Sequence, residues 1–117
     1  MTTVRIYHNP RCSKSRQALA LLEERGLEVE VIAYMETPPD NATLSELLKQ
    51  LDLSARDLMR RNEDIYKELN LDNPELSEAQ LVQAMVDYPK LIERPIVVAD
   101  GKAIVARPPE RVEELFQ

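Results

Sequence analysis

The sequence predicts a mixed α/β fold in the order β-α-β, helical block, β-β-α. Three observations lead to this order. Near the N-terminus, two short strand patterns flank one helical pattern. The middle of the chain carries several helix-start signals but no strand pattern. Near the C-terminus, Asp100-Gly101 stands between two further strand patterns and is a typical two-residue hairpin turn.

The two N-terminal strands are expected over residues 4–7 and 29–33. Between them, apolar residues at helical spacing predict a helix from about Ser13 to Arg25, and Gly26 is a good residue to end it. Because a β-α-β unit usually makes a right-handed crossover, we expect these two strands to be parallel.

The middle of the chain, about residues 40–92, is expected to form a helical insertion. Two of its segments look like capping boxes ahead of apolar helix positions, and a third segment opens a further helix. The three segments are Thr43-x-x-Glu46, Ser54-x-x-Asp57 and Ser77-x-x-Gln80.

The C-terminal strands are expected over residues 95–99 and 102–106, and Pro108-Pro109 starts a last helix. Together with the earlier elements, this gives a mixed sheet flanked by helices. It is the thioredoxin-like plan with a helical insertion. A length of 117 residues fits one domain, residues 1–117.

Composition and charge exclude several classes of protein. The formal net charge of −6 argues against a nucleic-acid binder. No apolar run is long enough to span a membrane, and the first residues lack the apolar stretch of a signal peptide. One cysteine and one histidine make neither an intrachain disulfide nor a zinc site. We therefore expect a cytoplasmic protein without a tightly bound cofactor.

The only cysteine, Cys12, lies between the first strand and the first helix. The free N–H groups and the positive dipole end of a helix N-terminus favour an anion. This field and the basic neighbours Arg11, Lys14 and Arg16 should together lower the pKa of the thiol. A free cysteine is often a small buried hydrophobe, and basic residues can cluster on a solvated face by chance. The polar neighbours fit a core position badly, so the pattern indicates a reactive thiolate beside an anion site.

Two further residues near Cys12 are candidates for the site. A protonated His8 could stabilise the thiolate or move a proton, although a lone histidine is usually an ordinary surface residue. Ser13 and Ser15 are candidates for capping the helix. Ser15 also stands where a C-x-x-C redox motif has its second cysteine, so this is a monothiol version of that motif. Arg16 gives C-x-x-x-R, which is not the phosphate loop of cysteine phosphatases.

Residues 6–12, Ile-Tyr-His-Asn-Pro-Arg-Cys, followed by Ser15-Arg16, resemble the active-site loop of the glutaredoxin-linked arsenate reductase family. The resemblance covers nearly the whole chain in order. Because the chain ends ten residues after Arg107, it is similar to the shorter branch of that family, which lacks the long C-terminal tail. The other matching segments are residues 34–39, 58–62, 66–69, 93–98 and 107–108.

The resemblance implies a set of functional residues. The family nucleophile matches Cys12, and His8 and Ser15 match the residues that support its thiolate. The family fold usually carries a cis proline at the position of Pro95. Three arginines grip the oxyanion in that family, and guanidinium forks suit a tetrahedral anion. The positions that match them are Arg60, Arg94 and Arg107.

The implied reaction is the reduction of arsenate to arsenite. It takes two electrons, which two thiols supply by becoming a disulfide, and this chain has one thiol. The family draws the second thiol from glutathione, as co-substrate, and then from glutaredoxin, as partner. Cys12 would displace hydroxide or water from arsenate, glutathione would attack the adduct, and glutaredoxin would take the glutathione as arsenite leaves.

Two other classes of protein remain open. One is a general monothiol, glutathione-linked oxidoreductase, for which the three arginines would be unneeded. The other is a non-enzymatic regulator that binds a protein partner, as some relatives of this fold bind RNA polymerase. Redox-sensing members of that group typically use a C-x-x-C pair, which Ser15 removes here.

Overall fold

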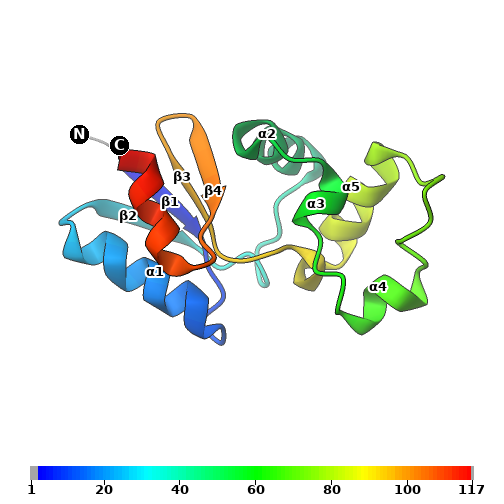
Figure 1. The fold of residues 1–117 in the computed structure, drawn as a ribbon, viewed down its shortest axis with the longest axis horizontal. Coiled ribbons are helices and arrows are strands. Elements are labelled where there is room, and N and C mark those ends of the chain that lie inside the picture. Colours follow the sequence, from blue (N-terminus) through cyan, green and yellow to red (C-terminus); the bar gives the residue numbers. More distant parts are fainter. Residues whose placement is uncertain (1–2, 117) are drawn as a thin grey trace. The chain divides into compact units, whose positions relative to one another are not determined.

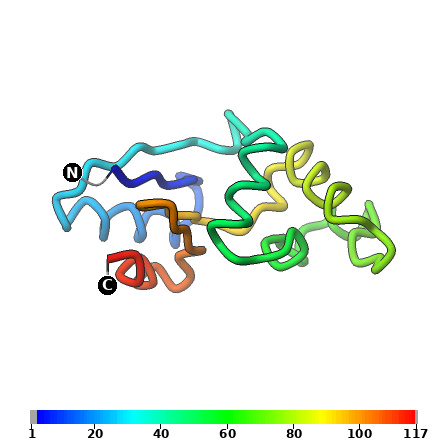
Figure 2. The backbone as a smooth tube through the Cα atoms, turned by 90° about the horizontal axis from the view of Figure 1, so that it is seen from above, coloured from blue at the N-terminus to red at the C-terminus, as the bar shows by residue number. Residues whose placement is uncertain are grey.

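The computed structural model describes residues 3–116. They fall into two compact units, one containing the residues up to Thr37 and from Arg94 onward, the other Pro38–Glu93. The chain leaves the first unit once and returns to it once (Figure 2). The second unit holds the helices expected over about residues 40–92 and is named the helical unit. A single domain over residues 1–117 stays a prediction.

The first unit is built on a four-stranded mixed sheet, so the expected α/β fold class is confirmed (Figure 1). Its spatial order is β2-β1-β3-β4, with β1 parallel to β2 and antiparallel to β3, and β3 antiparallel to β4. The strands are β1 (Thr3–Tyr7), β2 (Glu28–Ile32), β3 (Ile96–Ala99) and β4 (Lys102–Val105).

One face of this sheet is covered by α1 (Ser13–Glu24) and η2 (Pro109–Phe116). Side chains alternate along a strand, so Val4 and Ile6 share this face, and both are fully buried. The last helix differs from the expected α-helix because it is a 3₁₀-helix, and the Arg111 N–H already donates to the carbonyl three residues before it. The core residues are Val4, Ile6, Ala18, Leu22, Val97, Ala99, Ala106 and Val112.

Four strand ends meet at one edge of the sheet. Tyr7 ends β1 and pairs with Ile32, which ends β2, and with Ile96, which starts β3. Ile96 in turn pairs with Val105, which ends β4. Segments that are distant in the sequence are therefore brought together beyond this edge. These segments are residues 8–12, 33–37, 94–95 and 106–108.

Two turns of the first unit follow their local sequence. Asp100 and Gly101 have φ angles of 52° and 77°, the left-handed conformation that a two-residue hairpin turn requires. Gly26, with φ of 73°, follows α1 as expected. The peptide bonds before Pro95 and Pro108 are both cis.

The helical unit contains four short α-helices and one 3₁₀-helix (Figure 1). The capping box expected at Ser54 is present, and the helix expected to open at Ser77 begins there with a capping box as well. Among the described residues, no helix combines the length and apolar composition that crossing a membrane requires. The helices are α2 (Asn41–Leu51), α3 (Ala55–Leu58), α4 (Asp64–Glu68), α5 (Glu78–Asp87) and η1 (Pro89–Leu91).

The capping box expected at Thr43 and Glu46 is wrong. The helix α2 starts earlier, and its N-cap is Asp40, whose carboxylate accepts a hydrogen bond from the Thr43 N–H at 2.7 Å. Aspartate is a stronger N-cap than threonine, so the carboxylate sets the start of the helix and leaves Thr43 inside the first turn.

Candidate active site around Cys12

Cys12 is the N-cap residue of α1, with an extended backbone at φ −95° and ψ 121°. This corrects the expectation that Ser13 or Ser15 caps the helix. The Cys12 N–H donates a hydrogen bond to the Asn9 carbonyl at 3.0 Å and so closes the loop that precedes the helix. The thiol is half-buried, and it stands where the first helical N–H groups point outward.

Several groups act on the pKa of the Cys12 thiol, and the net result is a pKa below its ordinary value. Burial raises the pKa, whereas the Ser15 N–H, the Arg94 guanidinium and the Lys14 N–H lower it by hydrogen bonding to the thiolate. The helix N–H groups act as the sequence predicted, whereas the side-chain charges of Arg11, Lys14 and Arg16 are not among the main causes. Arginine and lysine side chains on the loop surface are exposed, so helix N–H groups and Arg94 have the stronger effect.

Two arginines reach the thiol from the other end of the sequence. Arg94 immediately precedes the cis Pro95, and its guanidinium is close enough to the Cys12 sulfur to lower the pKa of the thiol. Arg107 follows β4, and its Nη1 lies 4.0 Å from Cys12 Sγ and donates to the Arg94 carbonyl at 3.1 Å. The shared edge of the sheet explains why these residues meet. The arrangement surrounds a thiolate with two guanidinium groups, which suits a bound anion.

Ser15 and His8 form a buried pair beneath the loop. Ser15 is fully buried, and its Oγ accepts a hydrogen bond from the Asn9 N–H at 3.0 Å and lies 2.7 Å from His8 Nδ1. Burial and the Arg16 charge lower the pKa of His8, so the imidazole is neutral near pH 7. This disfavours a standing positive charge on His8 and leaves proton transfer and loop support as its possible roles.

We expect Ser15→Ala to lower the free energy of unfolding by about 1–3 kcal/mol, because the buried Asn9 N–H and His8 Nδ1 would lose their partner. Urea unfolding measures this difference. Ser13→Ala is the matched control, because Ser13 is exposed and starts the same helix. Equal urea midpoints for the two variants would contradict the buried role of Ser15.

Arg60, the third expected arginine, belongs to the helical unit. Its Nη1 donates to Glu93 Oε1 at 2.9 Å, and its Nε lies 3.8 Å from Glu63 Oε1. The Arg60 N–H also donates to the Leu91 carbonyl at 2.7 Å. Arg60 thus pairs with carboxylates of its own unit, and its part in the oxyanion site stays a prediction.

Sequence reasoning missed Tyr34 as a site residue. It is 1% exposed, follows β2, and lies near Asn9, Arg94 and Cys12, whose charges and hydrogen-bonding groups affect its pKa. The signal was available, because Tyr34 directly follows a strand predicted to run parallel to the strand before the cysteine loop.

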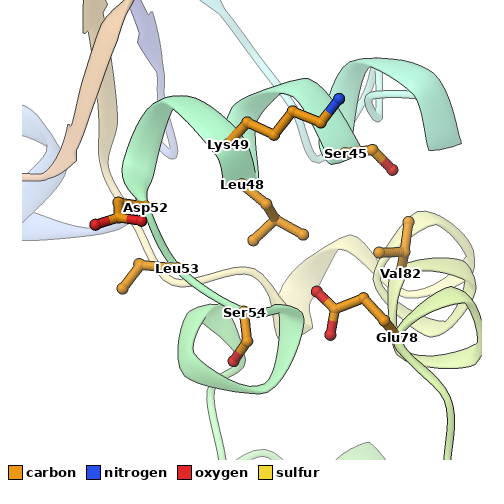
Figure 3. A pocket seen from close by; sticks show the side chains of 8 residues that line it. All are labelled: Ser45, Leu48, Lys49, Asp52, Leu53, Ser54, Glu78 and Val82. Atoms are coloured by element: carbon orange, nitrogen blue, oxygen red, sulfur yellow. The ribbon is translucent and has the colours of Figure 1, made fainter.

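Two of the cavities formed by the described residues lie in different units. One, of about 270 Å³, adjoins the cysteine loop and is lined by residues 8–11 together with Ala33, Met35 and Glu36. The other, of about 440 Å³, lies between α2, α3 and α5 in the helical unit, where Leu48, Val82 and Glu78 face it (Figure 3). The lining of the second cavity has no cysteine or arginine. Within residues 3–116, no cluster of three or more histidine, cysteine or carboxylate side chains could hold a metal ion.

Comparisons with known proteins agree with the motifs. An Escherichia coli K12 protein with the name uncharacterized protein YfgD is 66% identical over 113 residues, which are 96% of this chain and 95% of that protein. An arsenate reductase of Neisseria meningitidis is 55% identical over 117 residues, which are 99% of this chain and 100% of that protein. The solved structure of an arsenate reductase from Vibrio cholerae has a TM-score of 0.95 at 53% identity, covering 97% of this chain and 98% of that chain.

The family model gives the same result as the individual relatives. It matches residues 7–115, which include the cysteine loop and the segments that carry Arg94 and Arg107. The resemblance stated from the sequence motifs is therefore confirmed at the level of the family. This chain belongs to the ArsC family.

Proposed function

We propose that this protein is an arsenate reductase in which the Cys12 thiolate attacks arsenate. The observation that carries the proposal is the position of Cys12 at the N-terminus of α1, with Arg94 and Arg107 beside its sulfur. Relatives from Neisseria meningitidis and Haemophilus influenzae, 55% and 45% identical to this chain, carry the name arsenate reductase.

The guanidinium groups suit the substrate. Arsenate is a tetrahedral anion with several oxygen acceptors, and guanidinium forks bind such oxygens with paired, charge-assisted hydrogen bonds. Positive charge also offsets the repulsion between the Cys12 thiolate and the anion. We assign Arg94 and Arg107 to the oxyanion, and we propose Arg60 as the third arginine on the strength of the family resemblance.

The proposed reaction has four steps, and each one forms and breaks bonds at arsenic or sulfur. The Cys12 thiolate forms a sulfur–arsenic bond as one arsenic–oxygen bond breaks, and the leaving oxygen departs as water after taking up protons. The glutathione thiol then forms another sulfur–arsenic bond as a second arsenic–oxygen bond breaks, and the thiol proton leaves with that oxygen as water. A glutaredoxin thiolate attacks the glutathione sulfur, and the electron pair of the broken sulfur–arsenic bond reduces arsenic from the pentavalent to the trivalent state. Water finally releases arsenite and restores the Cys12 thiol.

The other loop residues have supporting roles in this proposal. Ser15 holds the shape of the loop through Asn9, and the neutral imidazole of His8 is suited to accept or return a proton during the exchange of oxygen on arsenic. The electrons come from thiols outside the chain, so no resident cofactor is needed. A cytoplasmic setting, where thiols are kept reduced, suits this chemistry.

The test is arsenate-dependent oxidation of NADPH in a mixture of the protein, glutathione, glutaredoxin and glutathione reductase. We expect turnover that requires every component, because each thiol supplies a separate step. Turnover that persists when glutaredoxin is left out would contradict the proposed order of thiols. A folded, reduced protein that shows no arsenate-dependent turnover but reduces mixed disulfides with glutathione would favour the general monothiol oxidoreductase.

A further inference from the structure

The environment of Tyr34 points to a role beyond packing. Tyr34 lies in the segment that follows β2. The Tyr34 N–H donates to the Ile32 carbonyl at 3.0 Å, and this hydrogen bond turns the chain beyond the edge of the sheet. The whole residue is 1% exposed, including the hydroxyl. A buried tyrosine hydroxyl normally finds a hydrogen-bond partner, because leaving it unpaired is unfavourable.

The Tyr34 hydroxyl does not have such a partner within residues 3–116. The side chains of Arg94 and Asn9 lie close enough to influence its pKa, yet none of the described residues forms a hydrogen bond of standard geometry with Oη. Arg94 Nε is in the same situation, buried and without a hydrogen-bond partner in the described part of the chain. Two buried N–H or O–H donors therefore lie beside the thiol that Arg94 also contacts.

The chemistry of these two groups is complementary to an anion. Guanidinium N–H groups only donate, and burial raises the pKa of Tyr34, so its hydroxyl keeps its proton at neutral pH. Asn9 uses its side-chain oxygen to accept from the Arg11 N–H at 3.0 Å, so that oxygen already has a donor. An oxygen of a bound oxyanion would satisfy both unpaired donors at once, and their burial would make each hydrogen bond stronger than in water.

We propose that the Tyr34 hydroxyl, next to Arg94, donates a hydrogen bond to an oxygen of the oxyanion held at Cys12. This inference rests on the proposed function for the identity of the anion. In this role Tyr34 is a substrate-binding residue that adds a neutral hydrogen-bond donor to the charged guanidinium groups of the site. It holds the oxyanion and its thiol adduct in one orientation while the outside thiols react.

The test is Tyr34→Phe, which keeps the ring and removes only the hydroxyl. We expect the arsenate concentration that half-protects Cys12 from iodoacetamide to rise roughly tenfold. This is the effect expected for the loss of one hydrogen bond to a charged group. Arsenate-dependent kcat/KM should fall roughly 100-fold, the lower end of the effect of removing an oxyanion donor. Without arsenate, the pH profile of alkylation should match that of the wild type, because Arg94 stays in place.

The matched control is Tyr7→Phe. Tyr7 is a buried tyrosine of the same unit whose pKa is affected by the charges of Arg5 and Glu30, and its variant should behave as the wild type in both measurements. Because Tyr34 Oη has no partner to lose within residues 3–116, Tyr34→Phe should be at least as stable as the wild type in urea. A purely structural role predicts the opposite pattern, a loss of stability with unchanged protection.

Equal protection of the wild type and Tyr34→Phe by arsenate would overturn the inference. Failure of this inference can be told apart from failure of the proposed arsenate reductase reaction. If arsenate protects the wild type but is not reduced, the proposed reaction is wrong, and weaker protection of Tyr34→Phe still supports the hydrogen bond. If arsenate does not protect the wild-type thiol at all, both the reaction and the role of Tyr34 are overturned.

Discussion

Replacing Cys12 by serine is expected to abolish arsenate-dependent turnover, with a loss of roughly 10⁴-fold or more. Every step of the proposed reaction passes through a sulfur–arsenic bond at this residue, and the chain has no second cysteine. A serine hydroxyl stays protonated at neutral pH even where the surroundings favour a thiolate. The coupled NADPH assay measures the loss directly.

The same substitution separates loss of chemistry from loss of folding. Cys12 is an N-cap residue whose side chain forms no capping hydrogen bond with the described residues, and serine is among the best N-cap residues. We therefore expect Cys12→Ser to unfold at the same urea concentration as the wild type or a higher one. Turnover by a folded Cys12→Ser protein within tenfold of the wild type would rule out Cys12 as the nucleophile.

The local parts of the fold were predictable from the sequence because short-range chemistry determines them. Asp100-Gly101 needs two left-handed residues and has them, and the capping boxes at Ser54 and Ser77 use side chains three residues apart. The prediction at Thr43 was wrong for the same local reason. Two N-cap residues stood close together, and Asp40 is the stronger competitor.

The candidate site was harder to predict because it depends on strand register. Arg94 and Arg107 lie far from Cys12 in the sequence and meet it because Tyr7 pairs with Ile96 and Ile96 with Val105. No spacing rule selects these arginines, so before the structure their roles rested on family resemblance alone. The sequence correctly assigned part of the lowered pKa of Cys12 to the helix N-terminus. It gave the remainder to charged side chains near Cys12 in sequence, whereas Arg94, which is near Cys12 in space, has the larger effect.

Arg94→Ala is expected to reduce arsenate-dependent kcat/KM roughly 1,000-fold, because this guanidinium contacts Cys12 and is placed to bind the oxyanion. It should also raise the pKa of the Cys12 thiol. The guanidinium stabilises the thiolate relative to the thiol, so its removal shifts the ionisation toward the thiol and moves the midpoint of iodoacetamide alkylation to higher pH. In the wild type this midpoint should lie below that of an ordinary thiol.

Two companion variants decide what Arg94 contributes. Arg5→Ala removes an arginine of the same unit that pairs with Glu30 at the surface, and it should leave turnover and the alkylation midpoint unchanged. Arg94→Lys keeps the charge but loses the planar fork, so it should keep part of the pKa effect while turnover stays low. Full turnover in Arg94→Lys would mean that positive charge alone suffices. An unshifted alkylation midpoint in Arg94→Ala would show that the helix N–H groups alone stabilise the thiolate.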